Sequence, residues 1–331
     1  MLYPLIFRPI LKERIWGGRT LQALYGKALP AGRPIGESWE VSDRPEDSSV
    51  VANGPLAGRD LHWLVDHYRR ELLGSAQPHN GRFPLLIKIL DAREKLSLQV
   101  HPPAFEARRL RGEPKTEMWY IADAAPGSEL YVGLRRGTTR AAFEENIRQG
   151  TVSNSFHRVK VRAGDAMFLP SGRVHAIGAG LVIFEIQQNS DTTYRVFDWN
   201  RVGLDGKPRQ LHVAESLASI DFNDFEPALV VRTPLAKEPQ PTQRLVSDLL
   251  FTVDLVEAAA GANWNSDPGV LQILGLLEGG LAVSGAGEMV RLNPGEFCLL
   301  PASIGAGFAA ASAGAKLLRV FAGEPRPPAT A

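Results

Sequence analysis

One nine-residue pattern occurs twice in the chain, and it constrains the possible folds more than any other feature. Segments 163–171 and 294–302 both contain glycine, an acidic residue, three further residues, leucine, proline and a small residue in the same order. A glycine–acid turn followed by a short apolar run that stops at proline is typical of a strand entered through a tight turn. The repetition predicts two structurally related units built of short strands.

The length and composition agree with this prediction. A chain of 331 residues corresponds to about two domains of ~150 residues each. Apolar residues make up 44% of it, which is enough for hydrophobic cores and too much for a disordered protein. Glycine and proline are frequent, with 32 and 24 residues, whereas methionine occurs only 4 times. Frequent turns between short strands explain these numbers better than a helical bundle does, so we predict a mainly β protein.

Local patterns place the individual elements. Helix 61–73 follows Asp60 as its N-cap and ends at Gly74. Prolines gather in 227–241, which we interpret as a linker, so the domain boundary is expected near residue 225. Further helices are expected at 139–150 and 213–220. Strands are expected at 37–42, 84–90, 96–100, 116–122, 129–132, 157–162, 166–169 and 181–187.

Charge and cysteine content limit the partners and the compartment. The formal net charge is +1 and no basic stripe stands out, so we expect no nucleic-acid partner. No apolar run reaches the ~18 residues of a membrane span, and Arg8 interrupts the apolar N-terminus, so neither a membrane anchor nor a signal peptide is expected. The single Cys298 cannot form an intrachain disulfide. We therefore expect a soluble cytoplasmic protein.

Four residues between positions 99 and 175 form a candidate metal site. Gln99 and His101 stand two positions apart, Glu117 begins a short strand after them, and His175 follows the first leucine–proline turn. Two imidazoles, one carboxylate and one amide suit a divalent cation of intermediate hardness, with zinc as the first choice. At the place of His175, the second copy of the repeated pattern has Ala306. The candidate chemistry is therefore confined to the first unit.

Four ordered segments carry a resemblance to a known family. Segments 95–102, 115–120, 169–178 and 191–199 resemble the type I phosphomannose isomerases, and segments 12–18 and 36–42 add to the match. The short bacterial branch of the family is the most similar. The resemblance is dense over about residues 3–220, whereas the last third matches only in general character.

The resemblance implies a fold and a division of the chain. It implies a cupin fold, mainly β, with two antiparallel barrels (jelly rolls) and a few short helices. Residues 1–225 would form the catalytic, metal-binding domain with a small helical insertion at about 58–75. Residues 226–331 would form a degenerate second cupin-like domain without metal ligands. The insertion is short, so the large lid of longer family members is not expected here.

The resemblance also implies a reaction and roles for residues. His101, Glu117 and His175 stand at the family's metal positions, and Gln99 is a further ligand in many members. Arg195 stands at the family's catalytic arginine. The family interconverts mannose 6-phosphate and fructose 6-phosphate with zinc, so the expected partner is a small sugar phosphate. An aldose–ketose exchange moves a proton between C1 and C2 through an enediolate, whose negative charge a metal or an arginine can stabilise.

Three more side chains suit this chemistry. Lys115 should point to the same side as Glu117 and can act as an acid/base partner if burial lowers its pKa. Lys88, alone in an apolar strand, and Ser97 suit the substrate phosphate.

Structural interpretations of the same residues remain open. Lys88 can instead extend to solvent from a barrel mouth, and Arg195 can pair with Glu185 or Asp198. Ser97 can be an ordinary strand hydroxyl.

Two other functions are compatible with the ligand set. One is a non-catalytic cupin that binds a sugar or sugar phosphate and uses the metal as a clip. The other is an iron-dependent oxygenase, because two histidines and one carboxylate also form an iron site.

Overall fold

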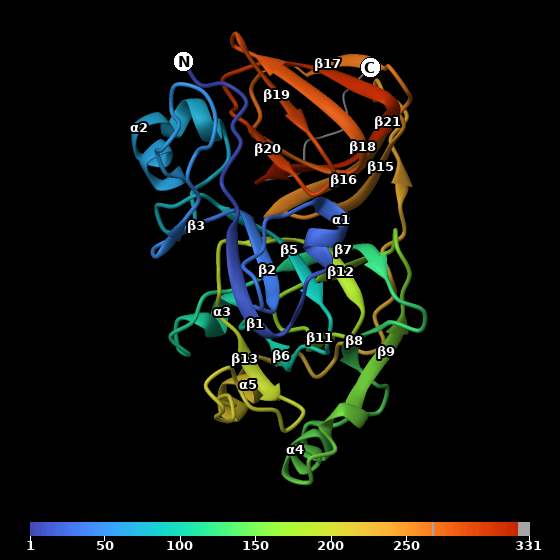
Figure 1. The fold of residues 1–331 in the computed structure, drawn as a ribbon. Coiled ribbons are helices and arrows are strands. Elements are labelled where there is room, and N and C mark those ends of the chain that lie inside the picture. Colours follow the sequence, from blue (N-terminus) through green and yellow to red (C-terminus); the bar gives the residue numbers. More distant parts are fainter. Residues whose placement is uncertain (267, 324–331) are drawn as a thin grey trace.

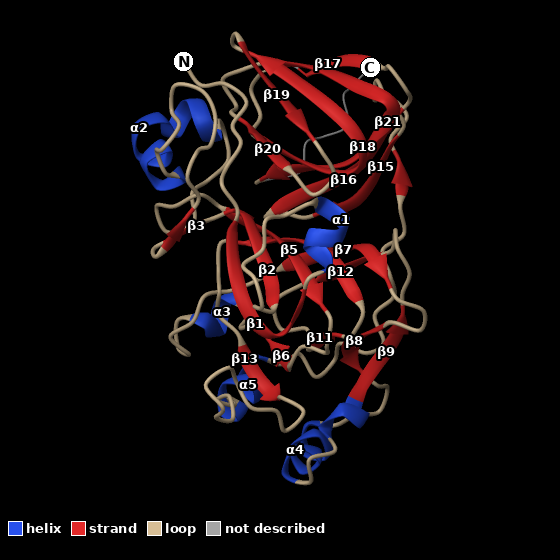
Figure 2. Cartoon of the chain, in the orientation of Figure 1, coloured by secondary structure: helices blue, strands red, loops and turns tan. Residues whose placement is uncertain are grey.

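Two β-structured units lie one above the other in the computed structural model, which describes residues 1–266 and 268–323. Figure 1 shows the N-terminal unit at the bottom and the C-terminal unit, in orange and red, at the top. Figure 2 shows that strands dominate both units and that most helices lie on the outside, whereas α1 (Thr20–Tyr25) lies where the two units meet. The predicted mainly β class is confirmed. Within the described residues, no helix is long and apolar enough to cross a membrane.

The first unit consists of two antiparallel sheets packed face to face. A six-stranded sheet has the order β1-β2-β5-β12-β7-β10, and a five-stranded sheet has the order β13-β6-β11-β8-β9. Trp119 and Ile121 from one sheet share an apolar core with Leu130 and Val132 from the other. The first sheet comprises β1 (Ile10–Gly18), β2 (Ile35–Val41), β5 (Leu85–Ala92), β7 (Glu117–Ala124), β10 (Ala166–Leu169) and β12 (Leu181–Gln188). The second comprises β6 (Leu98–Val100), β8 (Glu129–Leu134), β9 (Phe156–Lys160), β11 (His175–Ile177) and β13 (Tyr194–Phe197).

The second unit is one eight-stranded antiparallel sheet that curls on itself. Its path is β14-β15-β16-β21-β18-β19, with β17 paired to β21 and β20 paired to β18. The long strand β18 bends at Gly279, where a Cβ atom would lie 2.0 Å from the carbonyl oxygen of Gly314. The strands are β14 (Thr233–Pro234), β15 (Thr242–Ser247), β16 (Phe251–Ala258), β17 (Asn263–Ser266), β18 (Gln272–Gly285), β19 (Glu288–Leu292), β20 (Phe297–Leu300) and β21 (Ala306–Ala322).

Both copies of the repeated pattern fold in the same way. The carboxylate of Asp165 accepts a hydrogen bond from the backbone N–H of Arg162 at 2.9 Å, and that of Glu296 accepts one from Asn293 at 2.8 Å. Each turn leads into a short strand at the edge of a sheet, β10 beside β7 and β20 beside β18. The acid closes its turn within three residues, so this unit is encoded locally.

The helices match their sequence signals. The Asp60 side chain accepts a hydrogen bond from the Trp63 N–H at 2.7 Å and caps the second helix, as predicted. Thr139 caps the fourth helix in the same way. The predicted linker is not wholly irregular, because strand β14 lies inside it. The helical elements are α1 (Thr20–Tyr25), α2 (Leu61–Leu73), α3 (Ala104–Ala107), α4 (Arg140–Arg148), the 3₁₀ helix η1 (Val152–Ser155) and α5 (Val213–Ser219), and the hairpin β3 (Asp43–Arg44) and β4 (Asp47–Ser48) completes the elements.

One apolar core joins the two units. It contains side chains of the N-terminal segment, α2, β5 and β12 together with side chains of β16 and β21. Leu5 exchanges two backbone hydrogen bonds with Leu299, at 2.9 and 2.8 Å. The end of α2 accepts backbone hydrogen bonds from Ala302 and Ser303. Early residues therefore pack against the C-terminal sheet, as Figure 1 shows for α2, and the first unit is braced by the second.

Candidate metal centre

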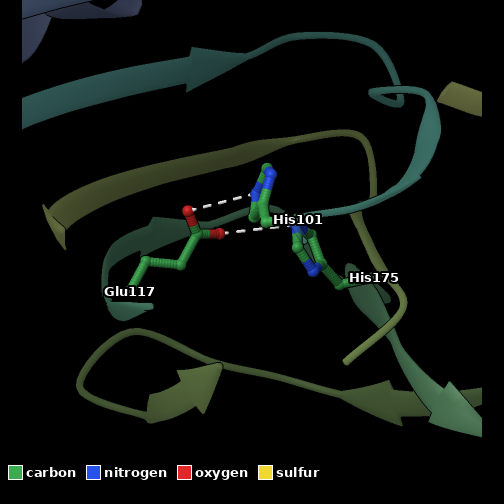
Figure 3. Close-up of side chains that lie close together, drawn as sticks. All are labelled: His101, Glu117 and His175. Atoms are coloured by element: carbon green, nitrogen blue, oxygen red, sulfur yellow. Dashed lines mark ion pairs between the residues drawn. The ribbon is translucent and has the colours of Figure 1, made fainter. Parts of the chain in front are cut away.

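Three predicted ligands meet inside the first unit. His101 follows the end of β6, Glu117 begins β7 and His175 begins β11. The pairing of β11 with β6 sets His175 opposite Gln99, and β7 belongs to the facing sheet, so Glu117 approaches from the other side. One ligand atom of each residue lies within 4.8 Å of the others, and all three side chains are buried (Figure 3).

The polar atoms of these three side chains face one another, but they form no hydrogen bonds with one another. Nε2 of His101 lies 3.4 Å from Oε2 of Glu117, and Nε2 of His175 lies 3.4 Å from Oε1. Nε2 of His101 and both carboxylate oxygens are buried and make no hydrogen bond with any described residue. Buried polar atoms nearly always have a hydrogen-bond partner. A cluster of potential ligand atoms without hydrogen bonds therefore fits a bound cation.

The outer nitrogens of the two imidazoles fix the tautomer that a metal requires. Nδ1 of His101 lies 2.8 Å from the carbonyl oxygen of Thr192, and Nδ1 of His175 lies 2.9 Å from that of Arg173. A carbonyl only accepts, so each Nδ1 carries the proton and each Nε2 lone pair faces the centre. Burial, with help from the Lys115 charge, lowers the pKa of His101 to about 4. Burial also lowers the pKa of His175.

Gln99 and Ser97 border the same centre. Nε2 of Gln99 lies 3.3 Å from Nε2 of His175, and the Ser97 hydroxyl donates to Oε1 of Gln99 at 3.3 Å. In this orientation the Gln99 amide nitrogen, not its oxygen, faces the centre. A ligand role for Gln99 requires the amide to be turned over, which exchanges atoms of nearly equal size.

Lys115 is also at the centre, but its electrostatics differ from the sequence expectation. The side chain is buried, and its Nζ lies 3.1 Å from Oε2 of Glu117. Burial by itself disfavours the ammonium form, yet Glu117, Glu185 and Asp191 together hold the pKa of Lys115 above its usual value. The idea that burial lowers this pKa is therefore wrong for the arrangement described here, because the neighbouring carboxylates outweigh desolvation.

Lys88 has a protein partner deep inside the first unit. It is only 3% exposed, so it does not extend to solvent, and its Nζ lies 3.2 Å from Oε2 of Glu185 on the neighbouring strand β12. Oε1 of Glu185 accepts a hydrogen bond from Trp119 Nε1 at 2.9 Å. The charge in this apolar strand is thus already compensated by a carboxylate before any phosphate binds.

Arg195 lies beside the centre with its charge uncommitted. Arg195 lies opposite Gln99 in the backbone pairing of β13 with β6. Its Nε is buried and has no hydrogen-bond partner among the described residues. Asp198, one of the two partners considered for it, instead binds Arg201 and Arg209. Arg195 also forms no ion pair with Glu185 within the described parts of the chain. Its guanidinium is therefore available to an anion.

Two charged residues of the first unit, Glu37 and Arg14, are not predicted from the sequence. Glu37 accepts hydrogen bonds from Arg14 at 2.9 and 3.2 Å and from Trp39 Nε1 at 2.6 Å. Burial opposes its charge, but Lys88 and Arg14 lower the pKa of Glu37 to about 2. In the predicted strand, Glu37 and Trp39 are two positions apart, so their carboxylate and indole N–H lie on the same face. This spacing was the sequence signal for their contact.

Comparison with known proteins decides the family. The family model of the type I phosphomannose isomerase catalytic domain matches residues 5–144. The mannose-6-phosphate isomerase ManA of Bacillus subtilis is 39% identical over 314 residues, covering 91% of this chain and 94% of that protein. The chain belongs to the phosphomannose isomerase family. The mannose-6-phosphate isomerase of Streptococcus mutans, 34% identical, matches 92% of this chain and 94% of its own.

A solved structure extends the family match to the fold. The crystal structure of the mannose 6-phosphate isomerase from Bacillus subtilis superimposes with a TM-score of 0.87 at 30% identity, covering 97% of this chain and 99% of that one. The resemblance inferred from the motifs and the cupin fold that it implied are both confirmed. Membership in the phosphomannose isomerase family and the His101–Glu117–His175 group together support a metal cofactor.

Proposed function

We propose that this phosphomannose isomerase family member interconverts mannose 6-phosphate and fructose 6-phosphate, with one zinc ion per chain held by His101, Glu117 and His175. The observation that carries the proposal is the convergence of two buried imidazole Nε2 atoms and a buried carboxylate within 4.8 Å, with Nε2 of His101 making no hydrogen bond to a described residue. Two nitrogens and one carboxylate oxygen are a common donor set for zinc in enzymes. When bound, such a cation supplies a Lewis acid that polarises a carbonyl and stabilises negative charge on oxygen.

The surrounding side chains have complementary roles in this proposal. The free guanidinium of Arg195 stabilises the enediolate oxygens or holds the phosphate, because its charge is permanent and its donors lie in one plane. The Lys115 ammonium, 3.1 Å from Glu117, adds positive charge at the reacting end of the sugar. Gln99 completes the ligand set in its turned orientation.

Substrate binding is assigned to Ser97 and Lys88. Ser97 presents a hydroxyl beside Gln99 at the rim of the centre. Lys88 is held in place by Glu185 and lies 5.1 Å from the centre of the Trp39 ring, which limits its freedom and orients its N–H groups. A phosphate would then share Lys88 with the carboxylate rather than replace a missing partner.

A cytoplasmic location is part of the same proposal. Cys298 is buried and forms no disulfide. A sugar phosphate is an intracellular metabolite class, which agrees with a chain that needs no oxidative cross-link.

A coupled isomerase assay on metal-stripped protein tests the proposal. Zinc, cobalt, manganese and iron are resupplied in turn, and turnover of mannose 6-phosphate is expected to return with zinc. His175→Ala should lose both metal and activity, whereas Arg195→Ala should retain metal and lose turnover. His157→Ala, at a partly exposed histidine outside the centre, is the matched control.

Three results would reject the proposal. Full turnover by metal-free His175→Ala protein would exclude the assigned centre. Wild-type protein that binds zinc and the sugar phosphate but never converts it would instead favour the non-catalytic cupin, and oxygen consumption with iron would favour the oxygenase.

A further inference from the structure

The second unit contains a cavity of about 660 Å³ that the isomerase reaction does not use. Its floor consists of inward-facing side chains of β16, β18 and β21, and one wall is the linker segment 234–239. Figure 1 shows these three strands side by side in the upper unit. A volume of this size is in the range of small-molecule sites, and a pyranose ring with its first hydration shell fits inside it.

Strand pairing shows that the cavity corresponds to the place of the metal centre. In the first unit, Glu117 pairs with Leu169 of β10 and with Gln187 of β12. In the second, Gln272 pairs with Leu300 of β20 and with Phe321 of β21. Since β10 and β20 are the two copies of the repeated pattern, Gln272 takes the position of Glu117.

A second equivalence supports the same superposition. Lys88 on β5 faces Glu185 on β12, with four paired positions between this pair and one end of the ladder and three between it and the other end. Asp254 on β16 faces Arg319 on β21 at the corresponding step of their ladder, with 2.9 Å between Oδ2 and Nη2. The buried ion pair is conserved in place between the two units but its charges are exchanged.

The replacements remove metal chemistry and leave hydrogen-bonding capacity. An amide at Gln272 and a methyl group at Ala306 stand where the metal centre has Glu117 and His175, so the cavity lacks the donor set for a cation. Gln272 is only 3% exposed, lines the cavity and makes no side-chain hydrogen bond with a described residue. Its amide therefore offers both a donor and an acceptor to a ligand.

The ion-paired charges in the cavity are balanced. Asp254 is fully buried and accepts hydrogen bonds from Arg244 and from Arg319. Arg319 also donates to Glu238 of the linker at 2.9 Å. Two arginines thus face two carboxylates inside the cavity. The other charged residue of the lining, Lys237, is exposed on the linker wall, so the interior itself carries no net charge to attract a strongly anionic ligand. Nε of Arg319 is buried and has no partner among the described residues, so one charged donor stays free.

The opposite wall is aromatic. Trp264 of β17 and Phe308 of β21 stack with ring centroids 5.1 Å apart and an interplanar angle of 27°. Leu274 and Leu317 continue this apolar surface. A ligand that fits both walls has a flat face of C–H groups that packs against the rings. On its edge it has hydroxyl groups that form hydrogen bonds with Gln272 and with the Arg319 guanidinium.

We propose that this second-unit cavity, lined by Gln272, Arg319, Asp254, Trp264 and Phe308, binds a neutral hexose without catalysing its conversion. The balanced charges select against the phosphorylated sugar, and the missing ligands exclude the metal-dependent chemistry of the first unit. This inference stands on the second unit alone and does not depend on the proposed isomerase activity.

Calorimetric titration tests the proposal with mannose, fructose and glucose as the probes. The protein is the full chain carrying His175→Ala, so that the first-unit centre is disabled. We expect saturable binding of one hexose per chain. Gln272→Leu removes the hydrogen bonds at nearly constant size, and Trp264→Ala removes half of the aromatic wall. Each should weaken binding by about 10-fold or more.

The controls separate loss of the site from loss of the fold. Asn263→Ala changes an exposed neighbour of Trp264 outside the cavity and should leave binding unchanged. Each variant must also keep the circular dichroism and melting temperature of its parent within a few degrees. Absence of saturable binding by all three hexoses, or binding that survives both cavity variants, would overturn the proposal. Binding of mannose 6-phosphate equal to or tighter than that of mannose would overturn its preference for a neutral sugar.

Discussion

Replacing Glu37 by glutamine should make the protein less stable, and the loss should be larger at neutral pH than at acidic pH. The carboxylate is held by Arg14 and by Trp39 Nε1, and Lys88 adds its charge from the neighbouring strand β5. Although burial opposes ionisation, these partners lower the pKa of Glu37 from its ordinary 4.5 to about 2. The carboxylate therefore binds its proton less readily in the folded chain than in the unfolded one.

The size and sign of the effect follow from this difference. A shift of about 2.5 pKa units corresponds to about 3 kcal/mol of stabilisation of the folded state by the ionised carboxylate. Because the folded-state pKa is the lower one, the contribution is complete above the unfolded pKa of 4.5 and is lost as the pH falls toward 2. By pH 3 about 2 kcal/mol of it should be gone.

Urea denaturation of metal-stripped wild-type and Glu37→Gln protein at pH 7, 5, 4 and 3 measures this directly. Removing the metal beforehand keeps protonation of the histidine ligands from differing between the two proteins. We expect a difference in unfolding free energy of about 3 kcal/mol at pH 7 that shrinks to about 1 kcal/mol at pH 3. Glu46→Gln, at an exposed position in the β3–β4 turn, should show no such dependence. A difference for Glu37→Gln that stays constant from pH 7 to pH 3 would refute the electrostatic explanation.

Three further predictions follow from packing and from the metal centre. A chelator should lower the melting temperature and zinc should restore it, because zinc at 100 times its dissociation constant adds about 2.7 kcal/mol to the unfolding free energy. Scanning calorimetry that shows no change would count against a structural contribution of the metal. Trp119→Phe should lower the unfolding free energy by about 1.5–3 kcal/mol, because the buried Glu185 carboxylate loses a donor at 2.9 Å; a loss below about 0.5 kcal/mol in urea denaturation would contradict this. Gly17→Ala should lower it by about 3 kcal/mol or more, because the new Cβ would lie 2.3 Å from the backbone nitrogen of Gly36, whereas Gly32→Ala, with nothing within 4 Å, should cost only about 1–2 kcal/mol for its left-handed backbone.

Local features of the chain were predictable from sequence. The glycine–acid turns close within three residues, and the caps at Asp60 and Thr139 act within one helical turn. Alternation and compact apolar runs placed most strands of the first unit within a few residues of their observed bounds. The separate histidines and the glutamate of the metal centre could be singled out because residue type and order carried the family resemblance.

Partners across strands were not predictable in the same way. The sequence showed Lys88 and Glu185 as lone charges in apolar runs, and only the pairing of β5 with β12 made them neighbours. The carbonyl of Thr192 orients His101 from 91 positions further along the chain. Whether Arg195 was paired with Asp198 could not be decided either, until the tertiary structure placed other arginines on that carboxylate.

The sequence by itself thus predicted two related β units and a set of metal ligands in the first of them. Those properties depend on residue type and on contacts within a few positions. The tertiary structure decided which charges are compensated, which atoms at the centre remain unsatisfied, and that the second unit keeps a polar cavity at the corresponding place. These properties depend on sheet register, which brings distant residues together. Register is formed by backbone hydrogen bonds that residues of nearly every type can make, so it leaves no local pattern in the sequence.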